Sequence, residues 1–232
     1  MSARAVLEEL RGRLVVSCQA PDDHPLRDTQ VMVAMARAAE QAGAAAIRCG
    51  GYGGVADIRA IRTAVTCPVI GLTKEGTTGV YLTPTLDAAR RVCDAGATVV
   101  AADATLRPRP DGSTVAQAIT LTHALGRLFM ADVDSADAGL AAAAAGADIV
   151  ATTLAARAGD GGPDLALVAR LRAELPADVF VVAEGHCRTP ADARAARVAG
   201  ADAVVVGTAI TDTRWIAARF VDAVAGIDAP TA

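Results

Sequence analysis

The chain has 232 residues, of which 53% are apolar and 3% aromatic, so one sizeable core must be built from Ala, Val, Leu and Ile. Its 22 basic and 26 acidic residues give a net charge of −4, and the arginines are spread along the chain without a basic run. This balance argues against a nucleic-acid partner. No apolar stretch reaches the roughly 18 residues that a membrane span requires, so we expect no membrane association and a cytoplasmic protein.

The five cysteines form no C-x-x-C pair and no His/Cys cluster with zinc spacing. We therefore expect reduced thiols, no metal site and no other cofactor. Cys18, Cys49 and Cys187 fall at predicted strand ends, where side chains can line a site.

An internal repeat organises the chain, in which Ala-Gly-Ala precedes a short apolar run four times. The glycines are Gly43, Gly96, Gly146 and Gly200, separated by 53, 50 and 54 residues. Another strand and helix fit between each pair, which makes the unit about 26 residues long. Each glycine is expected to end a helix in the left-handed conformation, directly before a strand.

Short apolar runs that alternate with helical patterns predict parallel strands joined by helices. In chain order, strands are expected near residues 14–18, 45–48, 68–72, 98–102, 128–131, 148–152, 179–183 and 202–206. Helices are expected between them, for example over 30–42, 85–95, 190–199 and 213–225. Eight such units predict a (β/α)8 or TIM barrel, a single α/β domain over 1–232 with its core over about 11–225 and short flexible termini. The competing fold is an open doubly wound sheet, but no G-x-G-x-x-G follows the first strand.

Active sites of such barrels lie at the carboxyl ends of the strands, where this chain places polar side chains. In strand order these residues are Gln19, Arg48, Lys74, Asp103, Asp132, Thr152 with Thr153, and Glu184. A structural role is the alternative for each of them, since a carboxylate such as Asp103 or Asp132 can simply cap the next helix. The convergence of so many polar groups at one end of a largely apolar chain favours a binding site.

Lys74 is the only lysine among the 22 basic residues. Arginine does not release its proton in a protein, whereas lysine can, so Lys74 is the first candidate for a catalytic base. The alternative is that a bias toward arginine left one lysine by chance on a surface loop.

The predicted third and seventh strands lie four positions apart in a ring of eight. Lys74 and Glu184 are therefore expected to face each other across the mouth of the barrel. Such a pair suits stereochemical inversion at a carbon next to a carbonyl, because one group removes a proton and the other assists or delivers one on the opposite face. For that role Lys74 must be neutral for part of the cycle, which desolvation and a cation such as Arg48 would favour.

Small residues follow the last two strands, Gly185 after the seventh and Gly207 with Thr208 after the eighth. Barrels often bind phosphate in these two loops, where backbone N–H groups can approach the anion. We therefore predict a phosphate ester there, although each glycine alone is also explained by a turn. His186 is ambiguous, while His24 and His123 are expected to be surface or helix residues without a role.

Nine segments closely resemble, in order, those of the N-acylmannosamine-6-phosphate 2-epimerases. They are VVSCQA (15–20), AAAIRCGG (44–51), PVIGLTK (68–74), VYLTPT (80–85), ADATLRPRPDG (102–112), MADVDS (130–135), VATTL (150–154), AEGHCRTP (183–190) and VVVGTAIT (204–211). The resemblance is specific because the whole set, and not one motif, falls at barrel-end positions.

The resemblance implies conversion of N-acetylmannosamine 6-phosphate to N-acetylglucosamine 6-phosphate by inversion at C2, without metal or nucleotide, in amino-sugar and sialic-acid catabolism. It implies that Lys74 is the acid/base acting on C2 of the ring-opened sugar and that Glu184 is its partner. It also assigns Gln19, Arg48 and Asp132 to the sugar, and the loops after the last two strands to the phosphate. Two hypotheses compete at this point: one lysine serves both faces of the intermediate, or the glutamate supplies the second proton.

Two segments depart from the family pattern. After the sixth strand the chain has TTLAARAGDGGPD (152–164), where the family usually has a loop that contains a tyrosine. After Ala-Ile-Thr it has Asp212, where many members have arginine, and Arg214 follows two residues later. Because an aspartate repels phosphate, we expect Arg214 to reach back to the anion, or backbone donors and another arginine such as Arg188 to bind it.

Two other classes of function stay open at this stage. A Schiff-base aldolase or a thiazole-synthase-like barrel would use Lys74 as a nucleophile toward a carbonyl. A non-catalytic sugar-phosphate-binding barrel is the other class, and the changed loop after the sixth strand supports it. Barrels commonly associate, so a homodimer is considered, but the sequence indicates no interface and no preferred N-acyl group.

Overall fold

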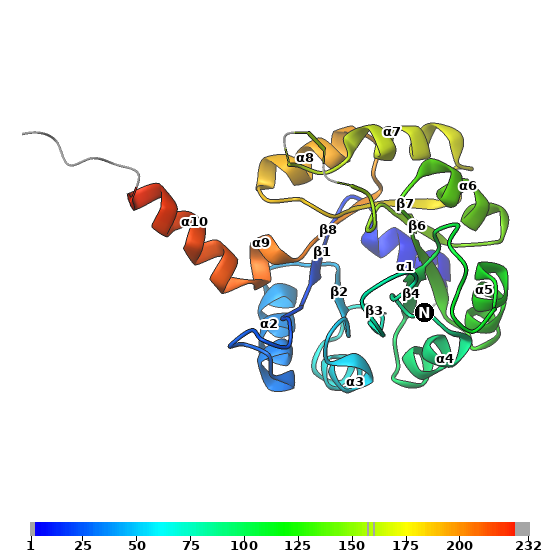
Figure 1. The fold of residues 1–232 in the computed structure, drawn as a ribbon, viewed down its shortest axis with the longest axis horizontal. Coiled ribbons are helices and arrows are strands. Elements are labelled where there is room, and N and C mark those ends of the chain that lie inside the picture. The colour runs from blue at the N-terminus through cyan, green and yellow to red at the C-terminus, as the bar shows by residue number, and fades with distance from the viewer. Residues whose placement is uncertain (1–2, 157, 160, 226–232) are drawn as a thin grey trace, which may run out of the picture.

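The computed structural model describes residues 3–156, 158–159 and 161–225 as a closed barrel of parallel strands (Figure 1). Each strand pairs with the next one along the chain, and β8 pairs with β1 to close the ring. The strands are β1 (Leu14–Ser17), β2 (Ala46–Cys49), β3 (Val69–Gly71), β4 (Val99–Asp103), β5 (Leu128–Asp132), β6 (Ile149–Ala151), β7 (Phe180–Glu184) and β8 (Ala203–Val206). The predicted (β/α)8 fold is confirmed, and every strand lies within one residue of its predicted bounds.

Helices surround the barrel as the connections between strands. They are α2 (Thr29–Gln41), α3 (Gly54–Ala64), α4 (Leu86–Asp94), α5 (Val115–Ala124), α6 (Ala136–Ala144), α7 (Leu165–Glu174) and α8 (Pro190–Val198), with α9 (Thr208–Thr211) and α10 (Thr213–Ala225) after the last strand. The four repeat glycines have the predicted left-handed backbone, with φ between +95° and +109°. An L side chain rarely adopts this conformation, so glycine lets each helix end and turn directly into the next strand.

The core has two parts, one inside the barrel and one between the barrel and its helices. Side chains such as Ile70, Met130 and Phe180 fill the interior and are at most 2% exposed. The outward side chains of the strands pack against the small, alanine-rich faces of the helices. An aromatic-poor chain can build this fold because alanine lets the helices approach the sheet closely.

The N-terminal residues differ from the expected short flexible segment. They form α1 (Ala3–Leu10), whose Val6 and Leu10 are at most 2% exposed and pack with the interior side chains of the barrel. Two apolar residues four apart lie on one helix face, so this helix buries its apolar side against the barrel.

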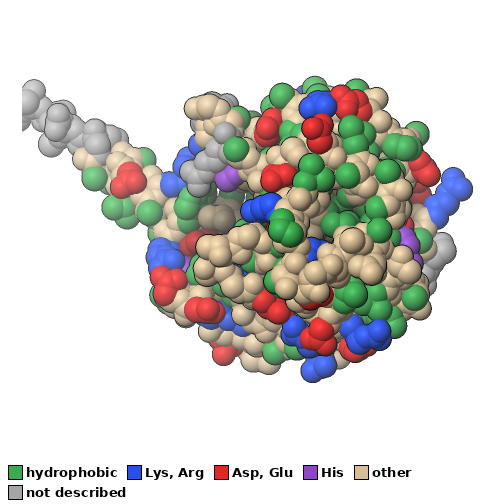
Figure 2. Space-filling view, turned by 45° about the vertical axis from the view of Figure 1, so that its right-hand side comes forward, with side chains coloured by type: hydrophobic (Ala, Val, Ile, Leu, Met, Phe, Trp, Pro, Cys, Tyr) green, Lys and Arg blue, Asp and Glu red, His purple; other side chains and the backbone are tan. Residues whose placement is uncertain are grey.

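The last helix, α10, projects from the barrel (Figure 1). None of its residues is buried, and Phe220, Val221 and Val224 are between 64% and 71% exposed. In Figure 2 its apolar side chains lie on the projecting part of the molecule. None of the described helices is long and apolar enough to cross a membrane.

Candidate active site

A cavity of about 410 Å³ opens at the carboxyl ends of the strands. Its wall includes polar groups from strands far apart in the sequence, among them Gln19, Arg48, Lys74, Thr153 and Glu184. Its volume is within the range that small-molecule ligands occupy. The strand-end residues that the sequence singled out therefore meet at one site, with the exceptions described below.

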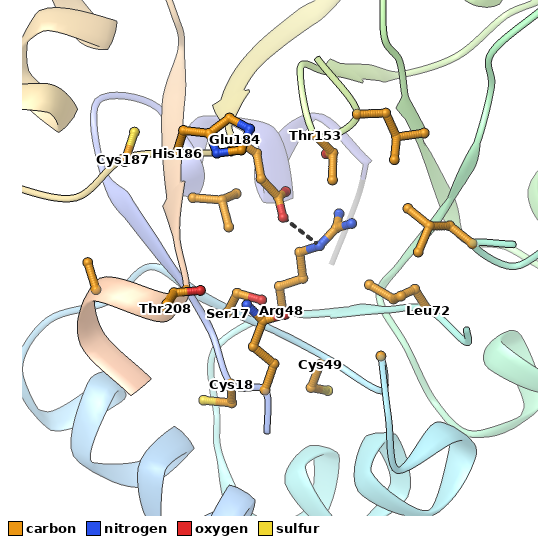
Figure 3. A pocket seen from close by; sticks show the side chains of 18 of the residues that line it. Ser17, Cys18, Arg48, Cys49, Leu72, Thr153, Glu184, His186, Cys187 and Thr208 are labelled. Atoms are coloured by element: carbon orange, nitrogen blue, oxygen red, sulfur yellow. Dashed lines mark ion pairs between the residues drawn. The ribbon is translucent and has the colours of Figure 1, made fainter. Parts of the chain in front are cut away.

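Arg48 lies at the floor of this cavity and is 2% exposed. Its guanidinium binds Asp132 through two bonds, Nη1 to Oδ1 at 3.2 Å and Nη2 to Oδ2 at 2.8 Å. Its Nε lies 3.1 Å from Oε1 of Glu184, an ion pair drawn in Figure 3. Burial disfavours the charge, but Asp132 and Glu184 outweigh this effect and raise the pKa of Arg48 above its ordinary value. Arg48 is thus a fixed cation between two carboxylates.

Glu184 ends β7 and points toward Arg48 (Figure 3). One carboxylate oxygen, Oε1, binds Arg48, while the other, Oε2, is buried and has no hydrogen-bond partner among the described residues. Burial raises the pKa of Glu184 to about 7, although Arg48 opposes this shift. An unpartnered carboxylate oxygen whose group titrates near neutral pH is well suited to exchanging a proton with a bound molecule.

Lys74 enters the cavity from the loop after β3. This loop folds back on itself, since Lys74 pairs with Leu82 in an antiparallel bridge and Thr83 N–H donates to the carbonyl of Thr73 at 2.8 Å. The turn is held by Thr83, a buried residue with φ of +43° whose hydroxyl donates to the carbonyl of Ala101 at 2.7 Å. A β-branched residue rarely adopts this backbone, and here several hydrogen bonds hold it there.

Gln19, from the loop after β1, lies against Gly207. A Cβ at position 207 would lie 2.7 Å from Gln19 Nε2 and 3.2 Å from Ser17 Cβ, so only glycine leaves Gln19 its place. The cavity wall also includes residues that follow β7 and β8, namely Gly185, His186, Arg188, Gly207 and Thr208. His186 has φ of +59° and follows Gly185 at +101°, so this segment turns sharply at the end of β7.

Four predicted site residues lie outside the cavity wall. Asp132 is fully buried and binds the guanidinium of Arg48. Thr152 links β6 to β7 through its hydroxyl, which donates to the carbonyl of Glu184 at 2.9 Å. Asp103 accepts from the N–H and the hydroxyl of Thr105 at 3.0 and 2.7 Å, and burial raises its pKa. Arg214 pairs with Asp23 at 3.3 Å on the surface. Thr153, by contrast, lines the cavity and donates to Oδ1 of Asp132 at 2.6 Å.

Asp212 does not line the cavity, although the sequence suggested that it would repel a phosphate there. Its Oδ1 accepts from the N–H of Trp215 at 2.9 Å and lies 3.1 Å from Nε2 of His24. His24 is only 5% exposed, which corrects its assignment as a surface or helix residue. His123 does lie on a helix, where its Nε2 is 2.7 Å from Asp148.

Several cavity residues were not singled out by the sequence. Trp215 and Arg219 are two of them, and Arg219 lies over the Trp215 ring at 4.8 Å. Tyr52 is outside the cavity wall but contacts Lys74, which lines it. Their signals were weak: Tyr52 stands between two pairs of glycines, and Arg219 lies one helical turn after the only tryptophan. Cys18, Cys49 and Cys187 line the cavity as expected, and all five cysteines are free and buried. Arg157 and Asp160, in the altered loop after β6, lie outside the described residues.

Fold and site together define a class of protein. A TIM barrel whose strand ends form a polar cavity, with titratable side chains such as Lys74 and Glu184 in its wall, has the architecture of a barrel enzyme.

Comparisons with known proteins identify the family. Residues 32–226 match the family model described as "Putative N-acetylmannosamine-6-phosphate epimerase". The chain is 51% identical over 216 residues to a Corynebacterium glutamicum protein, covering 91% of this chain and 93% of that one. It is 45% identical over 223 residues to one from Cutibacterium acnes, covering 94% and 96%. Both relatives bear the name "Putative N-acetylmannosamine-6-phosphate 2-epimerase".

A solved structure agrees with this result. The N-acetylmannosamine-6-phosphate 2-epimerase of Clostridium perfringens superimposes with a TM-score of 0.87 at 36% identity, covering 94% of this chain and 95% of that one. The chain belongs to the N-acetylmannosamine-6-phosphate epimerase family and is a carbohydrate epimerase, an isomerase.

Proposed function

We propose that the chain interconverts N-acetylmannosamine 6-phosphate and N-acetylglucosamine 6-phosphate by proton exchange at C2 of the ring-opened sugar. The observation that carries this proposal is the meeting of Lys74, Arg48 and Glu184 in one cavity. In the open chain, C2 is bonded to the aldehyde carbon, so its proton is acidic enough for removal by a positioned base. The names of the related proteins supply the substrate.

In the proposed mechanism, Lys74 and Glu184 act on opposite faces of C2. The Glu184 carboxylate takes the proton from one face, and the Lys74 ammonium delivers a proton to the other; the reverse reaction exchanges these roles. Arg48 balances the charge of Glu184 and of the enolate that forms between the two steps. The net result is inversion at C2 with no change in oxidation state. Glu184 then gives its proton to water and Lys74 takes one from water, which restores both groups for the next turnover.

Cavity charge supports an anionic substrate. The cavity is lined by four cationic side chains, Arg48, Lys74, Arg188 and Arg219. Among the described lining residues, Glu184 is the one carboxylate. A net positive, partly enclosed site attracts a phosphate ester. We propose that Gly185, Gly207 and Thr208 offer it backbone donors, and that Arg219 contacts it as a charged donor.

The test of this function is incubation with N-acetylmannosamine 6-phosphate in deuterated water, followed by NMR. We expect loss of the C2 proton signal together with appearance of the 2-epimer. Neither exchange nor epimer formation at high enzyme concentration would refute the proposed activity.

Arg219→Ala is expected to raise KM for the phosphorylated sugar roughly tenfold and to leave kcat within about twofold, because a charge-assisted bond to the phosphate is lost. Steady-state kinetics measure both constants. Arg214→Ala is the matched control, since it removes the same charge from a residue that faces Asp23 instead of the cavity. A larger KM effect from Arg214→Ala would assign the phosphate to Arg214, the residue expected from the sequence.

We also propose that the chain forms a homodimer through α10. Phe220, Val221 and Val224 are exposed on a helix that projects from its own barrel, and burial of these side chains needs a second molecule. A second copy is always present at the protein's own concentration, and symmetric self-association is the commonest assembly.

Phe220→Asp is expected to weaken dimerisation at least 100-fold, because a carboxylate would be buried without a partner. Sedimentation equilibrium measures the association. Leu106→Asp is the control, because Leu106 is 69% exposed, close to the 70% of Phe220, but lies in the loop after β4. A monomeric wild-type protein, or equal effects of both variants, would contradict this interface.

A further inference from the structure

Tyr52 makes a direct contact with the amine of Lys74. The Nζ atom lies 4.1 Å from the centroid of the Tyr52 ring, within the range of a cation–π contact. The neighbouring Gly51 follows the lysine stem, because a Cβ built there would lie 3.4 Å from Lys74 Cε. The loop between β2 and α3 therefore covers both the stem and the charged end of Lys74.

The ring is the principal partner of this amine. Among the residues that the structure describes, Lys74 forms no ion pair, in contrast to Arg48 with its two carboxylates. A lysine side chain has several rotatable bonds and loses considerable freedom when it is held in one place. Before substrate binds, the position of Lys74 Nζ is therefore set mainly by the face of the Tyr52 ring.

The loop that carries Tyr52 is fixed at both of its ends. At its start, Gly50 has φ of +96°, and a Cβ there would lie 2.2 Å from the carbonyl oxygen of Leu72. At its other end, a Cβ on Gly53 would lie 2.1 Å from Arg27, whose guanidinium binds Asp57 at 2.8 and 2.9 Å. Close packing of backbone at both ends holds Tyr52 over the lysine.

We propose that Tyr52 is a positioning residue for Lys74, holding its ammonium at the cavity wall on the side across from Glu184. The proposal rests on the acid/base role of Lys74 proposed above. The contact sets the start of the proton path: Nζ is held beside the cavity and does not swing into solvent. Tyr52 is 38% exposed and is not part of the cavity wall, so it can do this without occupying the site.

The first test uses the fact that Lys74 is the only lysine in the chain. Labelling with lysine that carries ¹³C at Cε gives one signal, which Lys74→Met removes. In the substrate-free protein we expect an upfield ring-current shift of the attached protons in the wild type and in Tyr52→Phe, and its loss in Tyr52→Leu. An unchanged signal in Tyr52→Leu would overturn the contact, whatever the protein's activity.

The second test separates positioning from simple packing. Tyr52→Leu, which keeps an apolar side chain but no ring, is expected to lower kcat about fivefold with KM within twofold, whereas Tyr52→Phe stays within twofold of wild type. Phenylalanines with increasing fluorination at position 52 keep the ring's shape but weaken its negative face, so kcat should fall in that order. Equal thermal unfolding midpoints for the Phe and Leu variants exclude a folding defect.

Three outcomes of the kinetic test would overturn the proposal. They are wild-type kcat for Tyr52→Leu, an effect on KM alone, and equal losses for the Phe and Leu variants, which would assign the role to the hydroxyl. Failure of the underlying function looks different. In that case Lys74→Met would retain activity, while the NMR shift in the substrate-free protein would still report on the ring.

Discussion

Replacing Lys74 with methionine is expected to lower kcat for epimer formation about 10³-fold, because a positioned acid or base contributes roughly 10²- to 10⁴-fold. Exchange of the C2 proton of N-acetylmannosamine 6-phosphate can persist through Glu184. Methionine preserves much of the apolar stem and removes the amine. NMR in deuterated water measures exchange and epimer formation in the same sample. Full activity of Lys74→Met would refute the role proposed for this residue.

Lys74→Arg is the control that separates charge from proton transfer. Arginine keeps the positive charge but does not release its proton at the pH of the assay. We therefore expect Lys74→Arg to bind the substrate more tightly than Lys74→Met and to be nearly as inactive. Substantial activity of the arginine variant would indicate that Lys74 acts only as a cation.

The same residue distinguishes epimerisation from Schiff-base chemistry. Borohydride reduces an imine to a stable amine, and Lys74 is the only lysine on which such an adduct can form. We expect no substrate-dependent adduct on the Lys74 peptide by mass spectrometry. An adduct on that peptide would support a covalent mechanism in place of direct proton exchange.

Much of the fold was predictable because the chain repeats one physical unit. A glycine that ends a helix, followed by an apolar run, gives the strand positions without any long-range information. The projection of α10 was not predictable in this way. Its bounds follow from local helical pattern, whereas its position depends on contacts that a helix pattern does not encode.

The site was predictable to the extent that strand ends determine it. Lys74, Glu184, Arg48 and Gln19 all face the cavity that their positions indicated. Asp103 shows where such reasoning ends: its carboxylate bonds to Thr105, two residues along, instead of facing a ligand. At a strand end, an aspartate can accept hydrogen bonds from its own loop or face a ligand, and the sequence does not decide between these two orientations.

Tyr52 and Arg219 mark a second limit of sequence reasoning. Both residues belong to segments that follow the strand ends. Tyr52 lies in the loop before α3 and contacts Lys74, and Arg219 lines the cavity from the second turn of α10. Their contributions depend on how those segments fold over the mouth, which the barrel repeat does not specify. Loops therefore carry much of what distinguishes one barrel site from another.

Glu184→Gln is expected to lower kcat/KM by at least 10²-fold and to remove a pH dependence centred near 7. Burial raises the pKa of Glu184 to about 7, and the proposed mechanism uses its carboxylate form as the base. In the wild type, kcat/KM should therefore fall about tenfold for each pH unit below 7. The substrate phosphate also titrates, with a second pKa near 6, and this dependence should persist in the glutamine variant. An unchanged profile in Glu184→Gln would assign the pH dependence to another group.

The raised pKa of Glu184 also affects the stability of the fold: raising the pH increases activity but lowers the free energy of unfolding. Its folded-state value, about 7, is above the ordinary value of 4.5, so the folded protein binds the proton more tightly than the unfolded chain. The resulting contribution to the free energy of unfolding is complete below about pH 4.5 and is lost as the pH rises to about 7. Its size is on the order of 3 kcal/mol, from about 1.4 kcal/mol for each pKa unit.

Denaturant unfolding at several pH values tests this linkage. Relative to the wild type, Glu184→Gln should gain stability as the pH rises from about 4.5 to 7, because glutamine does not ionise inside the barrel. Glu174→Gln is the control, since Glu174 has a side chain 40% exposed on α7 and pairs with Arg170. A constant difference between wild type and Glu184→Gln across this range would contradict the raised pKa. Glu184 therefore gains the charge that catalysis needs over the same pH range in which its contribution to the stability of the fold is lost, a conflict expected where a buried group serves chemistry.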